Sequence, residues 1–146
     1  EAAIVLSVVG DGMPLIYNGQ EAGEPKRLAF FEKDPIIWKQ HPIGDLYKKL
    51  FTLMKQNTAL WHAQWGALMI KVPNTNETEV FSFVRQNEKD KVFCVFNFST
   101  KTQNVTFKDD LYHGTYRDFT TQEMITFKED TTFSMAPWSY KVFVKE

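Results

Sequence analysis

The sequence contains a single cysteine, Cys94, among its 146 residues. One cysteine excludes an internal disulfide and any cysteine-based zinc cluster. Because Cys94 lies in an apolar, strand-like stretch, we expect it to be a core residue. The three histidines are far apart and lack ligand spacing, so neither a metal site nor a cofactor is expected in this chain. The seven glycines are dispersed and form no glycine-rich phosphate loop.

The chain also has no excess of charge of either sign. Its 17 basic and 18 acidic residues give a net charge of -1. Without a basic surplus, nucleic acid is not an expected partner. The apolar runs are too short to span a bilayer, so no membrane segment is predicted. The first three residues resemble no secretion signal, and we expect any targeting information to lie upstream of Glu1.

The length limits the architecture. A complete β/α barrel needs roughly 250 residues, so this chain cannot contain one. Hydrophobic residues make up 43% and charged residues 24%, as in an ordinary globular protein. The 13 phenylalanines lie mostly after residue 65 and predict a well-filled core in that part of the chain.

The first 21 residues have the order of one step of a β/α barrel. Residues 2–9 are apolar and suit a buried helix that ends at Gly10. Residues 13–17 are a short apolar run of the kind buried on both sides in a parallel sheet, and the proline within it fits only at the start of a strand. A glycine turn and a polar tip follow, where a barrel strand would end at its carboxyl-terminal rim.

Residues 42–57 give the clearest helix signal. Their apolar residues follow the i, i+3, i+4, i+7 spacing, and Pro42 suits the first turn. Residues 22–40, before this helix, have the composition of a loop. Five apolar side chains in that loop are expected to be pinned against a barrel: Phe30, Phe31, Ile36, Ile37 and Trp38.

After residue 65 the apolar period changes from helical to two. The pattern predicts strands at 67–72, 80–85, 92–98, 104–107, 114–119, 123–127, 131–135 and 139–144. Turn signals recur about every 8–12 residues, the spacing of a small antiparallel sandwich or barrel. The predicted fold is therefore mostly β. An antiparallel β-sandwich over residues 65–146 follows residues 1–64, which would hold the last helix–strand–helix of a β/α barrel.

Three stretches in order carry a resemblance to a known family. Gly12-Met13-Pro14-Leu15-Ile16-Tyr17-Asn18-Gly19-Gln20-Glu21 resembles the eighth-strand motif of the α-amylase family, glycoside hydrolase family 13. Residues 26–35 resemble a loop typical of bacterial members, and residues 41–50 resemble the last barrel helix. Residues 135–144 are more weakly similar to the last strand of the family's C-terminal β domain. A bacterial protein that is secreted or periplasmic is therefore favoured.

The resemblance implies a retaining glycoside hydrolase that acts on α-linked glucans. In that family the nucleophile Asp, the acid Glu and a third Asp lie on barrel strands four, five and seven, all before the eighth strand. By that mapping they would precede Glu1, so no catalytic residue is expected in this chain, which alone would be inactive. Calcium is possible in the whole protein but not expected here.

The resemblance does imply part of a substrate-binding rim. Asn18, Gln20 and Glu21 follow the eighth strand, so their polar groups would stand near a sugar-binding cleft. The alternative is that Gln20 and Glu21 only bond the loop backbone. Asn18 replaces a tyrosine common in the family, which puts aromatic stacking there in doubt.

Two other groups of residues have a structural and a functional interpretation. Glu21, Glu24, Glu32 and Asp34 form a local carboxylate cluster, which is better explained as a salt-bridged surface than as an acid–base pair. Arg27 would brace the rim or pair with Glu32 or Asp34. Trp61, Trp65 and Trp138 could stack on sugars, but core or domain-interface positions are favoured.

Two further functions stay open. The chain could come from a non-catalytic amylase-like scaffold, or residues 66–146 could be a carbohydrate-binding module. Because this chain lacks the neighbouring barrel strands, residues 13–17 would form a strand with two unpaired edges. Such edges invite pairing with another chain, so the chain alone is predicted to self-associate through these residues or to leave them poorly ordered.

Overall fold

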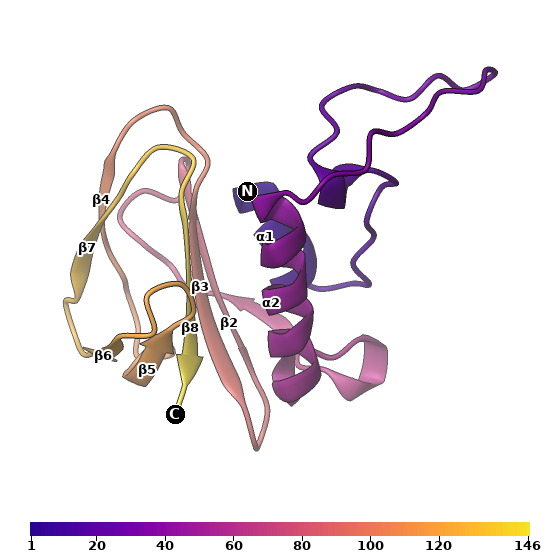
Figure 1. Ribbon diagram of the computed structural model, residues 1–146. Coiled ribbons are helices and arrows are strands. Elements are labelled where there is room, and N and C mark those ends of the chain that lie inside the picture. The colour runs from indigo at the N-terminus through magenta and orange to yellow at the C-terminus, as the bar shows by residue number, and fades with distance from the viewer.

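The computed structural model describes all residues 1–146 and has three layers (Figure 1). A six-stranded antiparallel sheet is in the middle, a two-stranded sheet covers one of its faces, and two helices cover the other. The helices are α1 (Ala2–Val9) and α2 (Pro42–Gln56), with short 3-10 helices η1 (Gln20–Ala22), η2 (Thr58–Leu60) and η3 (Ala63–Trp65). The strands are β1 (Met69–Lys71), β2 (Val80–Gln86), β3 (Lys91–Asn97), β4 (Gln103–Thr106), β5 (Gly114–Asp118), β6 (Met124–Phe127), β7 (Thr132–Met135) and β8 (Tyr140–Lys145).

The large sheet has the strand order β1-β2-β3-β8-β5-β6, and β4 pairs with β7 in the small sheet. All of these pairs are antiparallel, and each predicted strand after residue 65 is present within a few residues of its expected bounds. The mostly β, antiparallel part of the predicted fold class is confirmed.

Strand β3 lies at the centre, and every one of its residues is buried. Its side chains alternate between two cores, as the period of two along a strand requires. Phe93 and Val95 belong to an aromatic core between the two sheets, where the ring centroids of Phe93 and Phe107 are 5.1 Å apart. Cys94 lies in the other core, beneath the helices, so its predicted burial is confirmed.

The two helices share that second core with the sheet. Val5 and Val8 of α1 and Leu50 of α2 are fully buried and belong to one cluster with Phe83 and Cys94. Each burial of such a side chain contributes about 1.5–3 kcal/mol, so the helical layer is held to the sheet by apolar contact. The predicted boundary between residues 64 and 65 falls at η3, yet the core crosses it. Two domains with this boundary stay a prediction.

Local sequence explains where α2 begins. The His41 Nδ1 atom caps the helix by accepting a 3.2 Å hydrogen bond from the backbone N–H of Ile43. Pro42 occupies the first turn, where its missing N–H costs nothing. Both predicted helices are confirmed. Neither is long and apolar enough to cross a membrane.

The predicted strand at 13–17 is not formed, so the barrel helix–strand–helix is not confirmed. These residues pair with no strand, and Met13 and Leu15 are 81% and 73% exposed. The physical reason is that a strand forms only against a neighbour that supplies hydrogen-bond partners, and no strand of residues 1–146 pairs with this segment.

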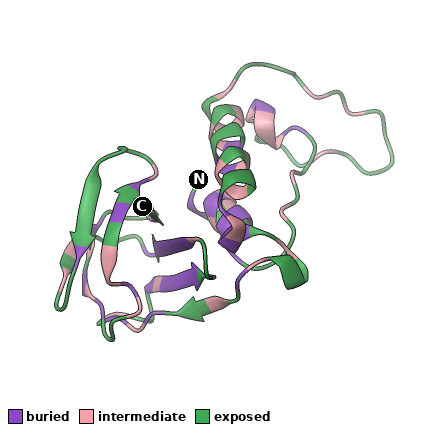
Figure 2. Cartoon of the chain, turned by 90° about the horizontal axis from the view of Figure 1, so that it is seen from below, coloured by how far each residue is buried: buried purple, intermediate pink, exposed green.

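The 22–40 loop also departs from expectation. It extends away from the other layers, and Figure 2 shows most of its residues exposed. Phe31 is 93% exposed, and Phe30, Ile37 and Trp38 are exposed as well. Ile36 is partly buried and lies close to Gly19. Nothing within residues 1–146 covers the other four side chains, and their pinning against a barrel stays a prediction, because the chain contains no barrel.

Candidate functional site

The predicted rim lies in a tight loop that packs against the first turns of α2. The backbone of Gly19 and of Gly23 has positive φ angles of 96° and 67°, and the short helix η1 stands between them. Gly44 of α2 permits a close approach, because a Cβ there would lie 2.8 Å from the carbonyl oxygen of Glu21. The structure thus places the polar residues 18–21 beside the N-terminal half of α2.

Gln20 connects this loop to α2. Its Oε1 atom accepts a 2.8 Å hydrogen bond from the backbone N–H of Tyr17 and a 3.2 Å bond from the hydroxyl of Tyr47. Burial, with a smaller contribution from the Glu21 carboxylate, raises the pKa of the Tyr47 hydroxyl. The hydroxyl therefore stays protonated and can act as the donor.

Glu21 bonds the loop in a similar way. Its Oε2 atom accepts a 3.1 Å hydrogen bond from the backbone N–H of Gly19. Asn18 is exposed at the tip. Gln20 and Glu21 thus both bond the loop backbone, and Gln20 also bonds Tyr47. Their use as sugar ligands stays a prediction.

A hollow of about 340 Å³ adjoins the rim, which is large enough for a small ligand. Its lining is mixed and contains charged, amide and aromatic groups. The residues are Ile16, Glu21, Lys39, Gln40, His41, Gly44, Asp45, Tyr47, Lys48 and Phe51. Such a set can bind hydroxyl groups. Its two carboxylates, Glu21 and Asp45, already contact the Gly19 backbone N–H and Lys48.

Residues 70–142 match the family model of the maltogenic amylase C-terminal domain. The chain belongs to this family. The matched range covers half of the chain and runs from β1 into β8, which are both strands of the large sheet.

Among curated relatives, the 1,4-alpha-glucan branching enzyme of Bacillus cereus is 31% identical over 102 residues. That alignment covers 62% of this chain but 15% of the enzyme, so the chain spans a small part of its relative's length. The maltogenic α-amylase AmyB of Thermotoga neapolitana has a similar structure, with a TM-score of 0.81, 16% identity and coverage of 99% of this chain and 35% of that one.

An α-amylase of Geobacillus thermoleovorans, solved with acarbose, has a TM-score of 0.77 at 18% identity. The alignment covers 99% of this chain and 32% of that one. Because both alignments reach 99% of the chain, they include α1, the rim loop and α2 as well as the sheets. At these identities the likeness shows a shared fold.

The structure shows a role for Arg85 that the sequence did not predict. It lies on β2, and its side chain is only 3% exposed. Its guanidinium donates to the carbonyls of Gly10, Trp61 and Ala67 at 2.7, 2.8 and 2.8 Å. Burial lowers the pKa of Arg85, and the nearby Asp11 carboxylate, 3.7 Å away, opposes that effect. Arg85 therefore joins the end of α1 to the segment that enters the sheet.

The four carboxylates of residues 21–34 do not form one paired group. Lys26 forms an ion pair with Asp34, and this hydrogen bond, with another from the Ala29 backbone N–H, lowers the pKa of Asp34. The salt-bridged surface is confirmed for that pair. Arg27 pairs with neither Glu32 nor Asp34. No group of three or more histidine, cysteine or acidic residues could hold a metal ion.

The tryptophans are not core residues within this chain. Trp65 and Trp138 are 70% and 58% exposed, and Trp61 is exposed too. The core alternative is wrong for all three. A place at an interface with another domain stays a prediction, because the exposure is that of residues 1–146 by themselves.

Proposed function

We propose that this chain is the C-terminal part of an α-amylase-family glycoside hydrolase that acts on α-linked glucans with retention of configuration. The observation that carries the proposal is the order of segments along the chain. An eighth-strand-like motif and its predicted polar rim come first, α2 follows, and a β domain of the maltogenic amylase family comes last. The glucan-active relatives and the coverage of α1 and α2 by amylase structures support the same assignment.

The role of residues 1–146 within that enzyme is structural. In the proposal, residues 13–17 fill the eighth position of the barrel, α1 and α2 pack outside it, and the β domain holds both helices through their shared core. Retaining hydrolysis requires two carboxylates about 5–5.5 Å apart, which an upstream barrel would supply. The chain alone is then inactive.

The rim residues would complete the substrate cleft of the whole enzyme. Gln20 uses its Oε1 atom within the loop, which leaves the amide N–H groups of its side chain to donate to a sugar hydroxyl. Asn18 is exposed and carries both donor and acceptor groups. Glu21 would orient the loop and accept from a hydroxyl. A calcium ion elsewhere in the whole enzyme is compatible with this role.

The exposed segment 13–17 would also drive self-association of the isolated chain. Its apolar side chains and unpaired backbone offer an edge to a second copy. Sedimentation should show concentration-dependent dimers that Leu15→Lys weakens. A chain that stays monomeric at every accessible concentration would contradict this part of the proposal.

The main test compares two proteins on one substrate. The longer protein encoded by the reading frame that extends upstream of Glu1 should release reducing sugar from maltoheptaose, whereas residues 1–146 should release none. Product anomers followed by NMR should retain the α-configuration. Turnover by residues 1–146 alone, or an upstream frame without barrel carboxylates, would overturn the proposal.

The exposed Trp65 and Trp138 favour a second candidate, a carbohydrate-binding module formed by residues 66–146. That candidate predicts millimolar or tighter binding of malto-oligosaccharides that is lost in Trp65→Ala or Trp138→Ala. Calorimetric titration of residues 66–146 with malto-oligosaccharides decides between this binding role and the structural role.

A further inference from the structure

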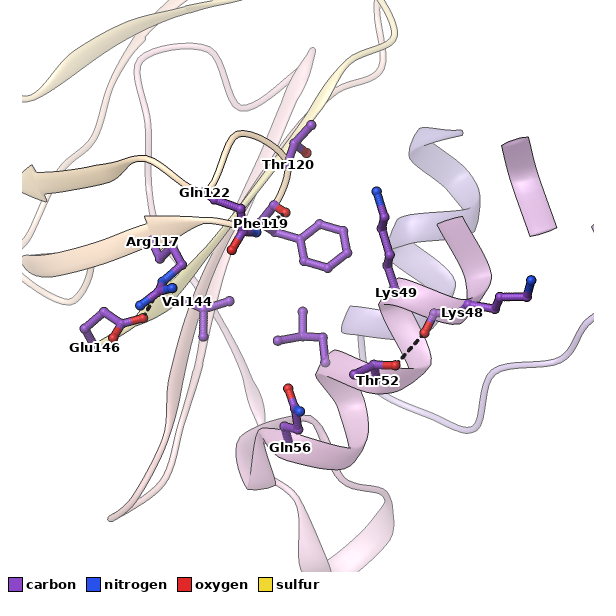
Figure 3. A pocket seen from close by; sticks show the side chains of 11 residues that line it. Lys48, Lys49, Thr52, Gln56, Arg117, Phe119, Thr120, Gln122, Val144 and Glu146 are labelled. Atoms are coloured by element: carbon purple, nitrogen blue, oxygen red, sulfur yellow. Dashed lines mark hydrogen bonds and ion pairs between the residues drawn. The ribbon is translucent and has the colours of Figure 1, made fainter. Parts of the chain in front are cut away.

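A groove of about 610 Å³ lies between α2 and the large sheet. One wall is the C-terminal half of α2, and the other comprises the turn after β5 and the end of β8 (Figure 3). The lining residues are Lys48, Lys49, Thr52, Leu53, Gln56, Arg117, Phe119, Thr120, Gln122, Val144 and Glu146. The volume lies within the range of ordinary small-molecule sites.

The groove combines an apolar base with polar walls. Leu53, Phe119 and Val144 are its three hydrophobic residues, and the ring of Phe119 points from the turn toward α2 (Figure 3). The polar side chains of Lys49 and Gln56 stand on the α2 wall, and both are exposed. An exposed polar wall suits water or a polar ligand better than an apolar protein surface.

The turn that carries Phe119 is held in place by a buried carboxylate. Asp118 accepts hydrogen bonds from the backbone N–H groups of Thr120 and Thr121 at 2.7 and 3.1 Å, and from Lys141 Nζ at 3.0 Å. The backbone N–H of Phe119 itself donates to the Val142 carbonyl at 2.9 Å. The aromatic side chain is therefore set at the groove before any ligand binds.

The same turn contains a strained residue at the edge of the groove. Gln122 has a φ angle of +64°, which a non-glycine residue rarely adopts. Its side-chain nitrogen donates to the Phe119 carbonyl at 2.8 Å, which leaves its amide oxygen as an acceptor. Strained backbone of this kind persists where the surrounding structure enforces it and is concentrated at binding sites.

Most of the charges in the groove are already paired. Arg117 Nε donates to Glu146 at 2.7 Å, and Lys48 lies 3.4 Å from Asp45. Lys49 has no ion-pair partner, and it is the one cation of the groove left to donate. With the amide groups of Gln56 and Gln122, this favours a neutral ligand with many hydroxyl groups over a multiply charged anion.

We propose that this groove binds a short α-glucan chain. The apolar face of a glucose ring would lie on Phe119, while Lys49, Gln56 and Gln122 would bond its hydroxyl groups. The choice of a glucan rests on the proposed function. The groove itself rests on the aromatic base, the fixed turn and the unpaired polar groups described above.

Titration of isotope-labelled residues 1–146 with maltotriose and maltoheptaose, followed by amide NMR, tests the proposal. Shifts should concentrate at residues 49–56 and 117–122, with a dissociation constant in the millimolar range or tighter. Phe119→Ala, Gln56→Ala and Lys49→Ala should each weaken binding about tenfold, which corresponds to about 1.4 kcal/mol. The last two residues are exposed, so their variants stay folded if Phe119→Ala does not.

The control variants are Trp65→Ala and Trp138→Ala, which should bind as the parent chain does. Binding that depends on either tryptophan and not on Gln56 or Lys49 would overturn the groove assignment. Absence of binding while the longer protein hydrolyses maltoheptaose would also overturn it, and would leave the proposed function intact. Groove binding with an inactive longer protein would support the groove and count against the hydrolase.

Discussion

The guanidinium of Arg85 donates a 2.7 Å hydrogen bond to the carbonyl oxygen of Gly10, 75 positions earlier in the sequence. Gly10 is the residue at which α1 ends, where helix carbonyls lack partners within the helix. The same side chain donates to Trp61 and Ala67. One buried cation thus fixes the direction in which the chain leaves α1 and so helps position the segment that leads to residues 18–21.

Replacing Arg85 tests this relationship through stability. Arg85→Met removes the donors and leaves several buried carbonyls unpaired, at about 1–3 kcal/mol for each unsatisfied group. We expect the free energy of unfolding in urea to fall by about 3 kcal/mol or more. Arg85→Lys should restore little, because an ammonium lacks the planar fork that reaches three carbonyls.

The matched control is Arg117, whose ion pair with Glu146 is exposed on both sides. Arg117→Met should leave the free energy of unfolding close to that of the parent chain, because exposed ion pairs contribute little. Equal losses for the two variants would show that Arg85 has no special role.

Gly66 packs closely against Trp61 and Arg85. A Cβ atom there would lie 1.8 Å from the Trp61 carbonyl oxygen and 2.9 Å from Arg85 Nη2. Gly66→Ala must therefore displace backbone, and we expect it to lower the free energy of unfolding by at least about 2 kcal/mol. Gly12→Ala is the comparison. It meets no atom within 4 Å and carries only the strain of a φ of +104°, about 1 kcal/mol. Thermal unfolding by circular dichroism measures both.

Asp118 predicts acid sensitivity. Burial raises the pKa of its carboxyl, but hydrogen bonds from the Thr121 and Thr120 backbone and from Lys141 outweigh that effect and lower the pKa overall. The folded pKa thus lies below the ordinary value of about 3.9. The resulting stability is complete above that value and is lost as the pH falls through the folded pKa.

The variant Asp118→Asn isolates this effect. At pH 7 this variant should lose about 1.5–3 kcal/mol of the free energy of unfolding, the range for hydrogen bonds to a charged group. The difference from the parent chain should shrink as the pH falls below about 3.9. A difference that stays constant down to pH 2 would show that the carboxylate charge is not the cause. The control is Asp45→Asn, because the ion pair of Asp45 with Lys48 is exposed.

Cys94 should report on unfolding. It is fully buried, and burial raises the pKa of its thiol, so little thiolate exists in the folded state. We expect iodoacetamide at pH 8 to label it only after denaturant opens the core beneath the helices. Rapid labelling of the native chain would mean that this core opens locally.

The sequence predicts the β domain well because its signals are local. The apolar period of two across residues 80–97 marks β2 and β3, and the apolar period of α2 marks the helix with its cap. The loop position of Gln20 and Glu21 also follows from local glycine turns. The sequence left open whether their side chains bond the loop backbone or a sugar.

Other features depend on distant partners and could not be predicted. The importance of Arg85 comes from carbonyls 24 and 75 positions away. The only sign of this role in the sequence is the position of Arg85, a charged residue at the end of an apolar strand. Residues 13–17 have the composition of a buried strand, but a strand also requires neighbours. The exposure of Trp65 and Trp138 likewise depends on which surfaces the rest of a protein supplies.

The central claim is that residues 13–17 become a paired barrel strand in the longer protein. In residues 1–146 the backbone N–H groups of Leu15 and Ile16 have no hydrogen-bond partner. Amide hydrogen exchange, measured on a dilute monomeric sample, should therefore be fast at both positions. In the longer protein we expect exchange at Leu15 and Ile16 to slow by about 100-fold or more, as in a core strand. Equally fast exchange in the longer protein would contradict the claim.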